Sequence, residues 1–205
     1  MTMFGAVETG PNDAPTAHAG RRHLSERQAE VMERLIAAAA EEAEERPYAE
    51  ISVRTIAKRA GLAPATAYTY FSGKDHLLAE VLLQCTQASP SLVDLTLPLP
   101  DRVADTARSM GFGAIGSAAV AVCTTALLGD GPDVKRVRSR LGAEITRRLA
   151  AALGAGVDPG VLDVLQVTYT GALLSAGMGH LAFEAVPPLM AEAAALMTGT
   201  GASAA

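Results

Sequence analysis

The sequence predicts an all-α fold. Hydrophobic residues make up 49% of the 205 residues, and the most frequent of them, Ala and Leu, are among the strongest helix formers. Apolar residues recur at i, i+3, i+4 and i+7, the spacing of one helix face. We find no alternating block bounded by hairpin turns that would predict a strand. A chain of this length can form one large domain or two small ones.

The chain begins with an expected disordered arm, residues 1–24. Its first twenty residues are Gly, Ala, Pro and Thr with scattered charge and no periodicity. Ser25 then opens a capping-box pattern with Gln28 at the third helical position. A helix is expected from there to Arg46, ended by Pro47. Its apolar stripe is Met32, Leu35, Ile36, Ala39 and Ala43.

Three further helices are expected in quick succession. Ser52 is placed to cap a short second helix that ends at Gly61. Pro64 suits the first position of a third helix. Ser72 and Asp75 form another capping-box pattern, which predicts the start of a fourth helix.

The remainder is expected to be helical after a hinge. Prolines interrupt residues 89–100, so this stretch cannot be a continuous helix. Helices resume at Asp101, with a break near residues 111–113. The later helices are expected over residues 133–153, 160–184 and 187–197. The polar face of the first of these three carries Lys135, Arg136, Arg138, Arg140, Arg147 and Arg148.

Several classes of protein are disfavoured by composition. The stretch that comes closest to a membrane-spanning run, residues 111–129, is uncharged but rich in Gly, Ser and Thr, and we interpret it as a buried helix pair instead of a membrane span. The N-terminus has no basic region followed by an apolar segment. Cys85 and Cys123 do not make a disulfide framework. The four histidines show no metal spacing. A cytoplasmic protein without a membrane partner, metal or cofactor is expected.

One segment opposes the overall charge of the chain. The formal net charge is −5, yet residues 52–74 contain four cationic side chains and no Asp or Glu. The second helix, the turn at Gly61 and the third helix together form a helix-turn-helix pattern. Such a unit places its second helix in the DNA major groove and its first helix across the backbone.

Helical geometry predicts which side chains would face DNA. Ala67 and Phe71 are four residues apart and are expected to face the core with Leu62, which turns the opposite face outward. Small residues there admit the helix to a groove about 12 Å wide, and Thr can contact base edges or a thymine methyl group. The alternative is a merely solvated cationic face. The candidate DNA contacts are Ser52, Arg54, Ala65, Thr66, Tyr68, Thr69, Tyr70 and Lys74.

The stretch VRTIAKRAGLAPATAYTYFSGKDHLLAEVL resembles the DNA-binding region of the tetracycline-repressor (TetR) family. The resemblance lies in the I-A-x-x-A-G core, the Y-x-Y-F end of the third helix and a following Lys with two leucines, and it covers residues 27–83. It implies a homodimeric regulator, usually a repressor, whose C-terminal domain dimerises and binds a small molecule that releases DNA. It also implies DNA-contact positions at Ser52, Arg54, Thr66, Tyr68, Tyr70 and Lys74.

The expected organisation therefore has four parts. A three-helix helix-turn-helix DNA-binding domain spans residues 25–72, and the fourth helix joins it to a helical effector-binding and dimerisation domain over residues 73–198. A disordered arm, residues 1–24, precedes them and a disordered tail, residues 199–205, follows.

Small residues repeat along the helix expected at residues 160–184, and we expect this stripe and the last helix to meet a partner subunit. Two-fold symmetry would place the recognition helices about 34–36 Å apart on a near-palindromic operator. The alternative is that these residues belong to the core of one chain. The candidate interface residues are Val164, Thr168, Gly171, Ser175, Gly179, Leu189, Ala193 and Leu196.

A small-molecule effector site is expected between helices of the C-terminal part. Its candidates have few charges and few aromatic rings, which favours an apolar effector over a cation or a nucleotide. Each of them can equally be plain core. Cys85 and Cys123 allow a thiol switch or inert packing. The candidate effector residues are Met110, Phe112, Ile115, Cys123, Leu127, Gln166, Tyr169, Thr170 and Met178.

The predicted function is that of a dimeric, sequence-specific transcriptional repressor released from its operator by a small apolar effector. A small helical enzyme is the competing class, but the sequence shows no nucleophile–base pair, paired carboxylates or metal cluster. The third class is an architectural DNA-binding protein that senses no effector, which would bind with steep salt dependence and little sequence preference.

Overall fold

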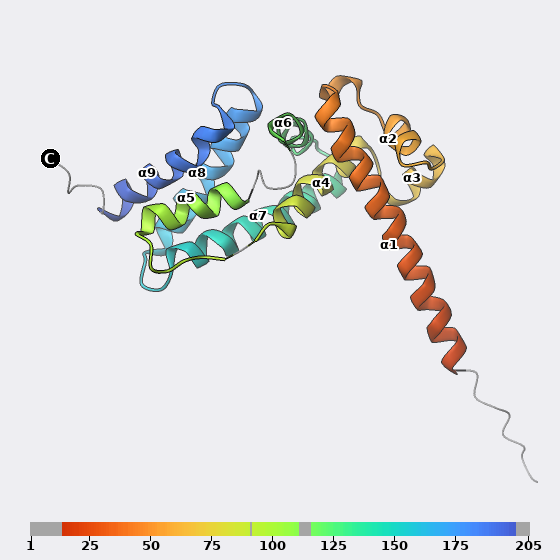
Figure 1. Cartoon of the computed structure of the whole chain (residues 1–205), viewed down its shortest axis with the longest axis horizontal. Helices are drawn as coiled ribbons and strands as arrows, with labels where there is room; N and C mark the ends of the chain where they lie inside the picture. The colour runs from red at the N-terminus through yellow and green to blue at the C-terminus, as the bar shows by residue number, and fades with distance from the viewer. Residues whose placement is uncertain (1–13, 91, 111–115, 200–205) are drawn as a thin grey trace, which may run out of the picture. The chain divides into compact units, whose positions relative to one another are not determined.

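The computed structural model describes residues 14–90, 92–110 and 116–199, and every regular element within these ranges is a helix (Figure 1). The all-α prediction is therefore confirmed. None of these helices combines the length and apolar character that a bilayer span requires. The chain divides into two units, residues 1–34 and 35–205, which do not coincide with the predicted domains 25–72 and 73–198. The domain boundaries stay a prediction.

The first helix, α1, spans Ala14–Glu45. It begins before the predicted cap, so Ser25 lies inside the helix and residues 14–24 of the predicted arm are helical. Pro15 is tolerated there because the first turn needs no N–H donor from it. The C-terminal end agrees with the prediction, since Pro47 follows it closely and disfavours helical dihedrals in the preceding residue.

The next two helices are bounded as expected. α2 spans Val53–Arg59, and the Ser52 hydroxyl oxygen accepts a hydrogen bond from the Thr55 N–H at 3.1 Å. The Thr55 hydroxyl oxygen accepts one from the Ser52 N–H in return, also at 3.1 Å, which completes a capping box. α3 spans Pro64–Tyr70 and begins with its proline, as predicted.

The predicted cap of the fourth helix is wrong. α4 spans Lys74–Ala88, and its N-cap position is Gly73, without a side-chain cap. Ser72 lies one residue too early, and its N–H donates instead to Nδ1 of His76 at 3.3 Å.

The second half of the chain contains five α-helices within the described ranges. The predicted break near residues 111–113 lies outside those ranges, between α5 and α6. α8 ends earlier than predicted, because Gly179 adopts φ 78° and the N–H of His180 donates to the Ser175 carbonyl at 2.9 Å. The helices are α5 (Leu99–Ser109), α6 (Ser117–Ala126), α7 (Pro132–Leu153), α8 (Pro159–Gly177) and α9 (Val186–Thr198), with short 3₁₀ turns η1 (Tyr48–Glu50) and η2 (Phe183–Ala185).

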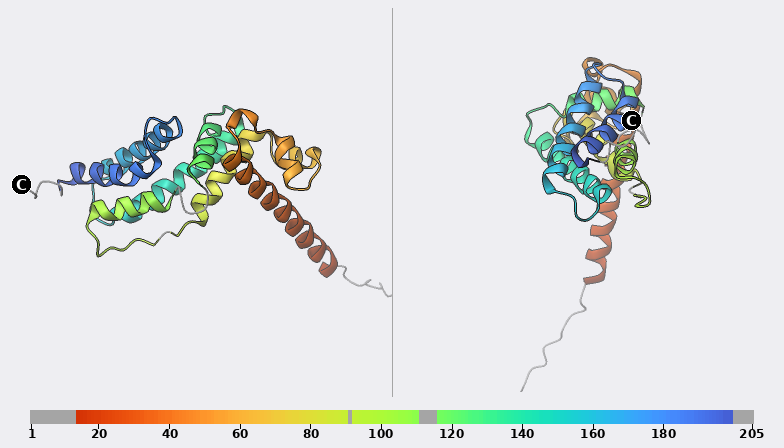
Figure 2. Two further views of the ribbon diagram at one scale, coloured as in Figure 1. Left: turned by 45° about the horizontal axis from the view of Figure 1, so that its top comes forward. Right: turned by 90° about the vertical axis from the view of Figure 1, so that its left-hand side faces the viewer.

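These helices form a bundle in which α4 packs on α6 and α7, and α8 packs on α6, α7 and α9. α5 packs against α9 and α7, and the blue helices α8 and α9 lie together near the C-terminal end in Figure 2. The predicted inner face of α7 is buried throughout, as is much of α4. The buried residues of α7 include Val134, Val137, Leu141, Ile145 and Leu149.

Arg148 of α7 is a buried cation that contacts the C-terminal end of α4. The sequence placed it on the polar face of α7, but its exposed fraction is 1%, because it lies on the same helical face as Leu141 and Ile145. Its Nε donates to Glu144 Oε1 at 2.6 Å, and its guanidinium also donates to the Ser89 carbonyl at 3.0 Å. It therefore satisfies carbonyl oxygens that the last turn of a helix leaves unpaired.

Glu144 is shared between two arginines. Hydrogen bonds from Arg147 and then from Arg148 lower the pKa of Glu144 to about 2, against the opposing effect of burial. Arg147, in contrast to Arg148, is exposed and pairs only at the surface. The Glu144 carboxylate therefore pairs with one buried arginine, Arg148, and one exposed arginine, Arg147.

Replacing Arg148 with Ala should lower the free energy of unfolding by about 3 kcal/mol or more, since the change leaves the carbonyls at the end of α4 without their donor and removes the buried partner of Glu144. Arg147→Ala is the matched control and should cost about 1 kcal/mol or less. Urea unfolding of both variants at one protein concentration measures the difference. Equal losses would show that Arg148 is not the anchor of α4.

Candidate nucleic-acid interface

The turn between α2 and α3 is specified by its backbone. Gly61 adopts φ 65°, a conformation that side chains other than Gly rarely tolerate. The Gly61 N–H donates to the Lys58 carbonyl at 3.1 Å, and the Leu62 N–H donates to the Ala57 carbonyl at 2.9 Å. These two bonds form a Schellman motif, which ends α2 and lets the chain reverse into α3.

The third helix buries one face and exposes the other. Ala67 and Phe71 are almost fully buried, as the sequence predicts. Ala65 and Thr69 are exposed, as is Tyr68 with an exposed fraction of 58%. The two remaining candidates, Thr66 and Tyr70, are half-buried. The outward face is therefore composed of small and hydroxyl-bearing side chains.

Three of the predicted DNA contacts already have partners within the chain. The Ser52 hydroxyl caps α2, and the Thr69 hydroxyl donates to the Ala65 carbonyl at 3.1 Å. Lys74 donates from Nζ to the Tyr48 carbonyl at 2.8 Å and lies 3.9 Å above the Tyr48 ring. An ammonium group has three donors, so Lys74 retains others for a phosphate. The role of these residues at DNA stays a prediction.

Arg59 is neutralised by α1. Its Nε donates to Glu42 Oε1 at 2.7 Å, and its two terminal nitrogens bond Glu41 and Glu45. The hydrogen bond from Arg59 lowers the pKa of Glu45, and the same bond raises the pKa of the guanidinium. The sequence counted Arg59 among the four cations of residues 52–74. The acidic end of α1, sequence EEAEER, is the signal that predicts its pairing.

Arg54 and Lys58 remain exposed on α2. They are four residues apart and so lie on one face of the helix. Among the described residues of the helix-turn-helix, these two present charge to solvent and form no ion pair with a carboxylate. The exposed cationic surface on α2 is therefore smaller than the four cationic side chains of residues 52–74 indicate.

Contacts also run from the helix-turn-helix to the later helices. A Glu44 carboxylate oxygen at the end of α1 accepts the N–H of Gly116, the N-cap of α6. A Cβ at Gly116 would lie 2.8 Å from Glu44 Oε2, so the approach is close. On α4, Asp75 accepts the hydroxyl of Tyr48. Burial and, next, this bond raise the pKa of Tyr48 to about 12.

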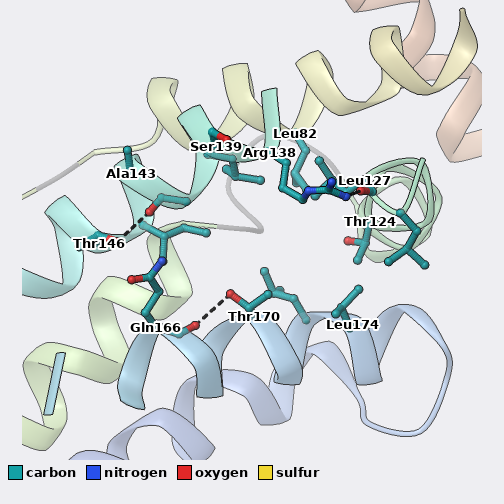
Figure 3. Close-up of a pocket in the computed structure, with 15 residues that line it drawn as sticks. Leu82, Thr124, Leu127, Arg138, Ser139, Ala143, Thr146, Gln166, Thr170 and Leu174 are labelled. Carbon is teal, nitrogen blue, oxygen red and sulfur yellow. Dashed lines mark hydrogen bonds between the residues drawn. The ribbon is translucent and has the colours of Figure 1, made fainter. Parts of the chain in front are cut away.

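A cavity of about 450 Å³ lies among α4, α6, α7 and α8 (Figure 3). Arg138 is its one charged lining residue, and Arg138 Nη1 donates to the Leu127 carbonyl at 2.6 Å. The lining residues are Leu82, Thr124, Leu127, Leu128, Arg138, Ser139, Leu141, Gly142, Ala143, Ile145, Thr146, Gln166, Thr170, Leu173 and Leu174.

Three of the predicted effector residues line this cavity: Leu127, Gln166 and Thr170. Met110 and Tyr169 border a small neighbouring void instead. Cys123 is buried, Met178 is exposed, and neither lines the cavity. Phe112 and Ile115 lie outside the described residues.

The sequence pattern did not predict that α7 lines the cavity with small and hydroxyl-bearing side chains. Ser139, Ala143 and Thr146 line the cavity from a helix that was assigned an apolar inner face and a basic outer face. A stripe of small residues between those two faces, including Gly142, is the signal that would have found them.

Apolar side chains remain uncovered on α8 and α9. Val164, Leu189 and Leu196 of the predicted interface are exposed, Leu196 to 76%, and Val167, which the sequence did not single out, is exposed to 73%. A Cβ at Gly171 would meet no atom within 4 Å. Gly179 is exposed, whereas Thr168, Ser175 and Ala193 are half-buried. These residues do not form the core of a single chain.

Neither cysteine has the environment of an activated thiol. Burial raises the pKa of Cys85, and burial together with nearby Cys85 and Glu44 raises that of Cys123. Protonated thiols are poor nucleophiles, which favours inert packing over a thiol switch. In the described part of the chain, no group of three or more His, Cys, Asp or Glu residues is placed to hold a metal ion.

Known proteins are similar to this chain in both sequence and fold. Residues 35–81 match the family described as bacterial regulatory proteins, tetR family. HTH-type transcriptional regulators of Mycobacterium bovis and Mycobacterium tuberculosis are 39% identical over 189 residues, which cover 91% of this chain and 89% of each relative.

Solved structures agree at the level of the fold. A TetR transcriptional regulator from Rhodococcus sp. RHA1 aligns with a TM-score of 0.65 at 21% identity, covering 85% of this chain and 98% of that one. A second regulator from the same organism aligns with a TM-score of 0.63 at 21% identity, covering 82% and 96%. The chain therefore belongs to the TetR family of DNA-binding transcriptional regulators and is not an enzyme.

Proposed function

We propose that the protein is a homodimeric repressor that binds a near-palindromic operator and is released from it by a small molecule. One observation carries the effector-responsive part of this proposal. α6 lines the cavity through Thr124, and the residues at and after its C-cap, Leu127 and Leu128, line it too. Its N-cap Gly116 is bonded to Glu44 at the end of α1. One helix thus contacts both the candidate effector site and the helix-turn-helix.

Base contacts are assigned to the outward face of α3. Ala65 and Thr69 are exposed and small, so they let the helix backbone approach the floor of the major groove. Thr66 is half-buried beside them and can offer its hydroxyl or methyl to a base edge. Tyr68 projects from the same helix and suits a phosphate oxygen at the groove edge.

Phosphate contacts are assigned first to α2. Arg54 and Lys58 are exposed, whereas the Arg59 charge is neutralised by three carboxylates. Ser52, Tyr70 and Lys74 are proposed to add contacts at the rim. Phosphate contacts fix the register of a protein on DNA without reading the sequence.

The uncovered face of α8 and α9 is assigned to the partner subunit. Val164, Val167 and Leu196 expose apolar area next to Gly171, which permits a close helix approach. Two copies would bury this area in a four-helix interface, and a two-fold axis would then repeat α3 at a spacing of about one helical turn of DNA.

Release is assigned to a shift of α6. A ligand in the cavity contacts α6 and can favour one of its positions over another. Because Glu44 holds the N-terminus of α6, that preference is passed to α1 of the helix-turn-helix. The cavity favours this mechanism over an architectural DNA-binding protein that senses no effector.

Selection of bound sequences from random DNA should return a near-palindromic motif with half-site centres about one helical turn apart. The same selection with Thr66→Ala should lose preference at one base position in each half-site, with the rest of the motif unchanged. Recovery of no motif, with binding that only tracks salt concentration, would support the architectural class instead.

Arg54→Ala should weaken operator binding across all sequences and reduce the salt slope of log K by about one per subunit, because it removes a phosphate contact. Arg108→Ala is the matched control, and its salt slope should stay unchanged because Arg108 lies on α5, outside the helix-turn-helix, and pairs with Asp105 at the surface. Binding isotherms at several salt concentrations measure both slopes. A loss at Arg108 equal to that at Arg54 would contradict the assignment.

Val167→Glu should convert the dimer to a monomer, since it places a charge in the proposed apolar interface. Leu95→Glu, at an exposed apolar residue in the link between α4 and α5, is the control and should stay dimeric. Sedimentation equilibrium gives the mass of each variant. A dimeric Val167→Glu variant would remove this face from the interface.

A further inference from the structure

We infer that the cavity among α4, α6, α7 and α8 binds a monoanionic amphiphile, a small molecule with an aliphatic body and a single carboxylate held by Arg138 and Thr124. The inference rests on the proposed function only where it treats this ligand as the effector. Its binding part stands on the cavity alone. The sequence predicted an apolar effector; the structure adds a charged head and places it.

The body of the ligand follows from the walls of the cavity. Leu82, Leu141, Ile145, Leu173 and Leu174 supply aliphatic surface, and no aromatic side chain is among the lining residues described. Aromatic ligands gain from ring stacking, which these walls do not offer. A flexible aliphatic chain is therefore the better match, and a volume of about 450 Å³ lies in the range of small-molecule sites.

Three hydroxyl groups of the lining add little polarity. Ser139 donates to the Lys135 carbonyl at 3.0 Å, Thr146 to the Gly142 carbonyl at 2.8 Å, and Thr170 to the Gln166 carbonyl at 2.9 Å. Each of these hydroxyl hydrogens is thus engaged by its own helix. The polar recognition of a ligand must come from elsewhere in the lining.

Thr124 is the exception among the hydroxyl-bearing residues. Its exposed fraction is 4%, and its buried Oγ1 has no hydrogen-bond partner among the residues that the structure describes. A buried polar group without a partner costs about 1–3 kcal/mol. A ligand atom that accepts a hydrogen bond from this hydroxyl would remove that cost. Figure 3 shows Thr124 on the α6 side of the cavity, near Leu127.

Arg138 decides the charge of the ligand head. The described residues of the lining include no Asp or Glu, so the guanidinium sets the sign of the local field. A guanidinium has five N–H donors, and the structure shows one bond from Arg138, to the Leu127 carbonyl at 2.6 Å. The other donors can meet a carboxylate in a two-point contact. A cationic head would be repelled at the same position.

The same contact explains how such a ligand would act on α6. Leu127 is the C-cap of α6, and Thr124 lies one turn before it. A carboxylate bound between Arg138 and Thr124 would draw on the same guanidinium that holds the Leu127 carbonyl. Binding would then change how the C-terminal end of α6 is held to α7, while Glu44 holds the other end.

Three compounds with the same ten-carbon chain test the inference: decanoate, 1-decanol and decylammonium, each kept below its aggregation concentration. Calorimetric titration of the full-length protein should give the tightest binding for decanoate, about tenfold tighter than for the alcohol, and the weakest for the cation. Equal or tighter binding of decylammonium, or binding of none of the three, would overturn the inference.

Variants locate the head group. Arg138→Gln should reduce decanoate binding to the level of the alcohol and leave the alcohol unchanged. Arg140→Gln is the matched control, because Arg140 is on the same helix, pairs with Glu80 and does not line the cavity. Thr124→Val should weaken decanoate and decanol alike. Decanoate binding that is unaffected by Arg138→Gln would overturn the assignment.

Operator binding separates this inference from the proposed function. Decanoate should release the protein from a selected operator, and Arg138→Gln should still bind that operator but resist release. Arg138-dependent binding of decanoate without release would support the carboxylate site and contradict the effector mechanism. Operator release by another compound, with decanoate not bound, would support the effector mechanism and contradict the carboxylate site.

Discussion

The guanidinium of Arg148 holds the C-terminal end of α4, and α4 connects the two functional parts of the molecule. Arg148 donates to the Ser89 carbonyl just beyond the last turn, and the other end of α4 follows α3 after a three-residue link. Between these ends α4 packs on α6 and α7. Because a buried charge must keep its partners, the register of α7 against the end of α4 is specified by polar contacts as well as by packing.

Although the chain is acidic overall, two cationic side chains of the helix-turn-helix stay exposed to solvent. The net charge is −5, and three acidic side chains of α1 are drawn to Arg59 on the helix-turn-helix. This pairing fastens α2 to the end of α1 and leaves Arg54 and Lys58 facing solvent. In the proposed function, the electrostatic attraction to DNA therefore depends on a few residues on one face, because most opposite charges of this region neutralise each other.

The short helix α6 is the element through which the cavity and the helix-turn-helix meet. Its N-terminus bonds Glu44, and its C-terminal carbonyl at Leu127 bonds Arg138 of α7. Both bonds involve a charged side chain at a helix end, where backbone groups lack partners within the helix. Such bonds can be exchanged for bonds to a ligand at small cost, whereas the packed leucines of α4 and α7 cannot rearrange so readily.

Local signals in the sequence determined the helices, the Ser52 cap, the Gly61 turn and the outward face of α3, because capping, glycine conformation and helical periodicity act over a few neighbouring residues. Tertiary structure alone decided that Arg59 and Arg148 are paired, and that α7 lines a cavity through Ser139, Ala143 and Thr146. Each of these outcomes depends on residues far apart in the chain, since the partners of a side chain are set by which helices pack together.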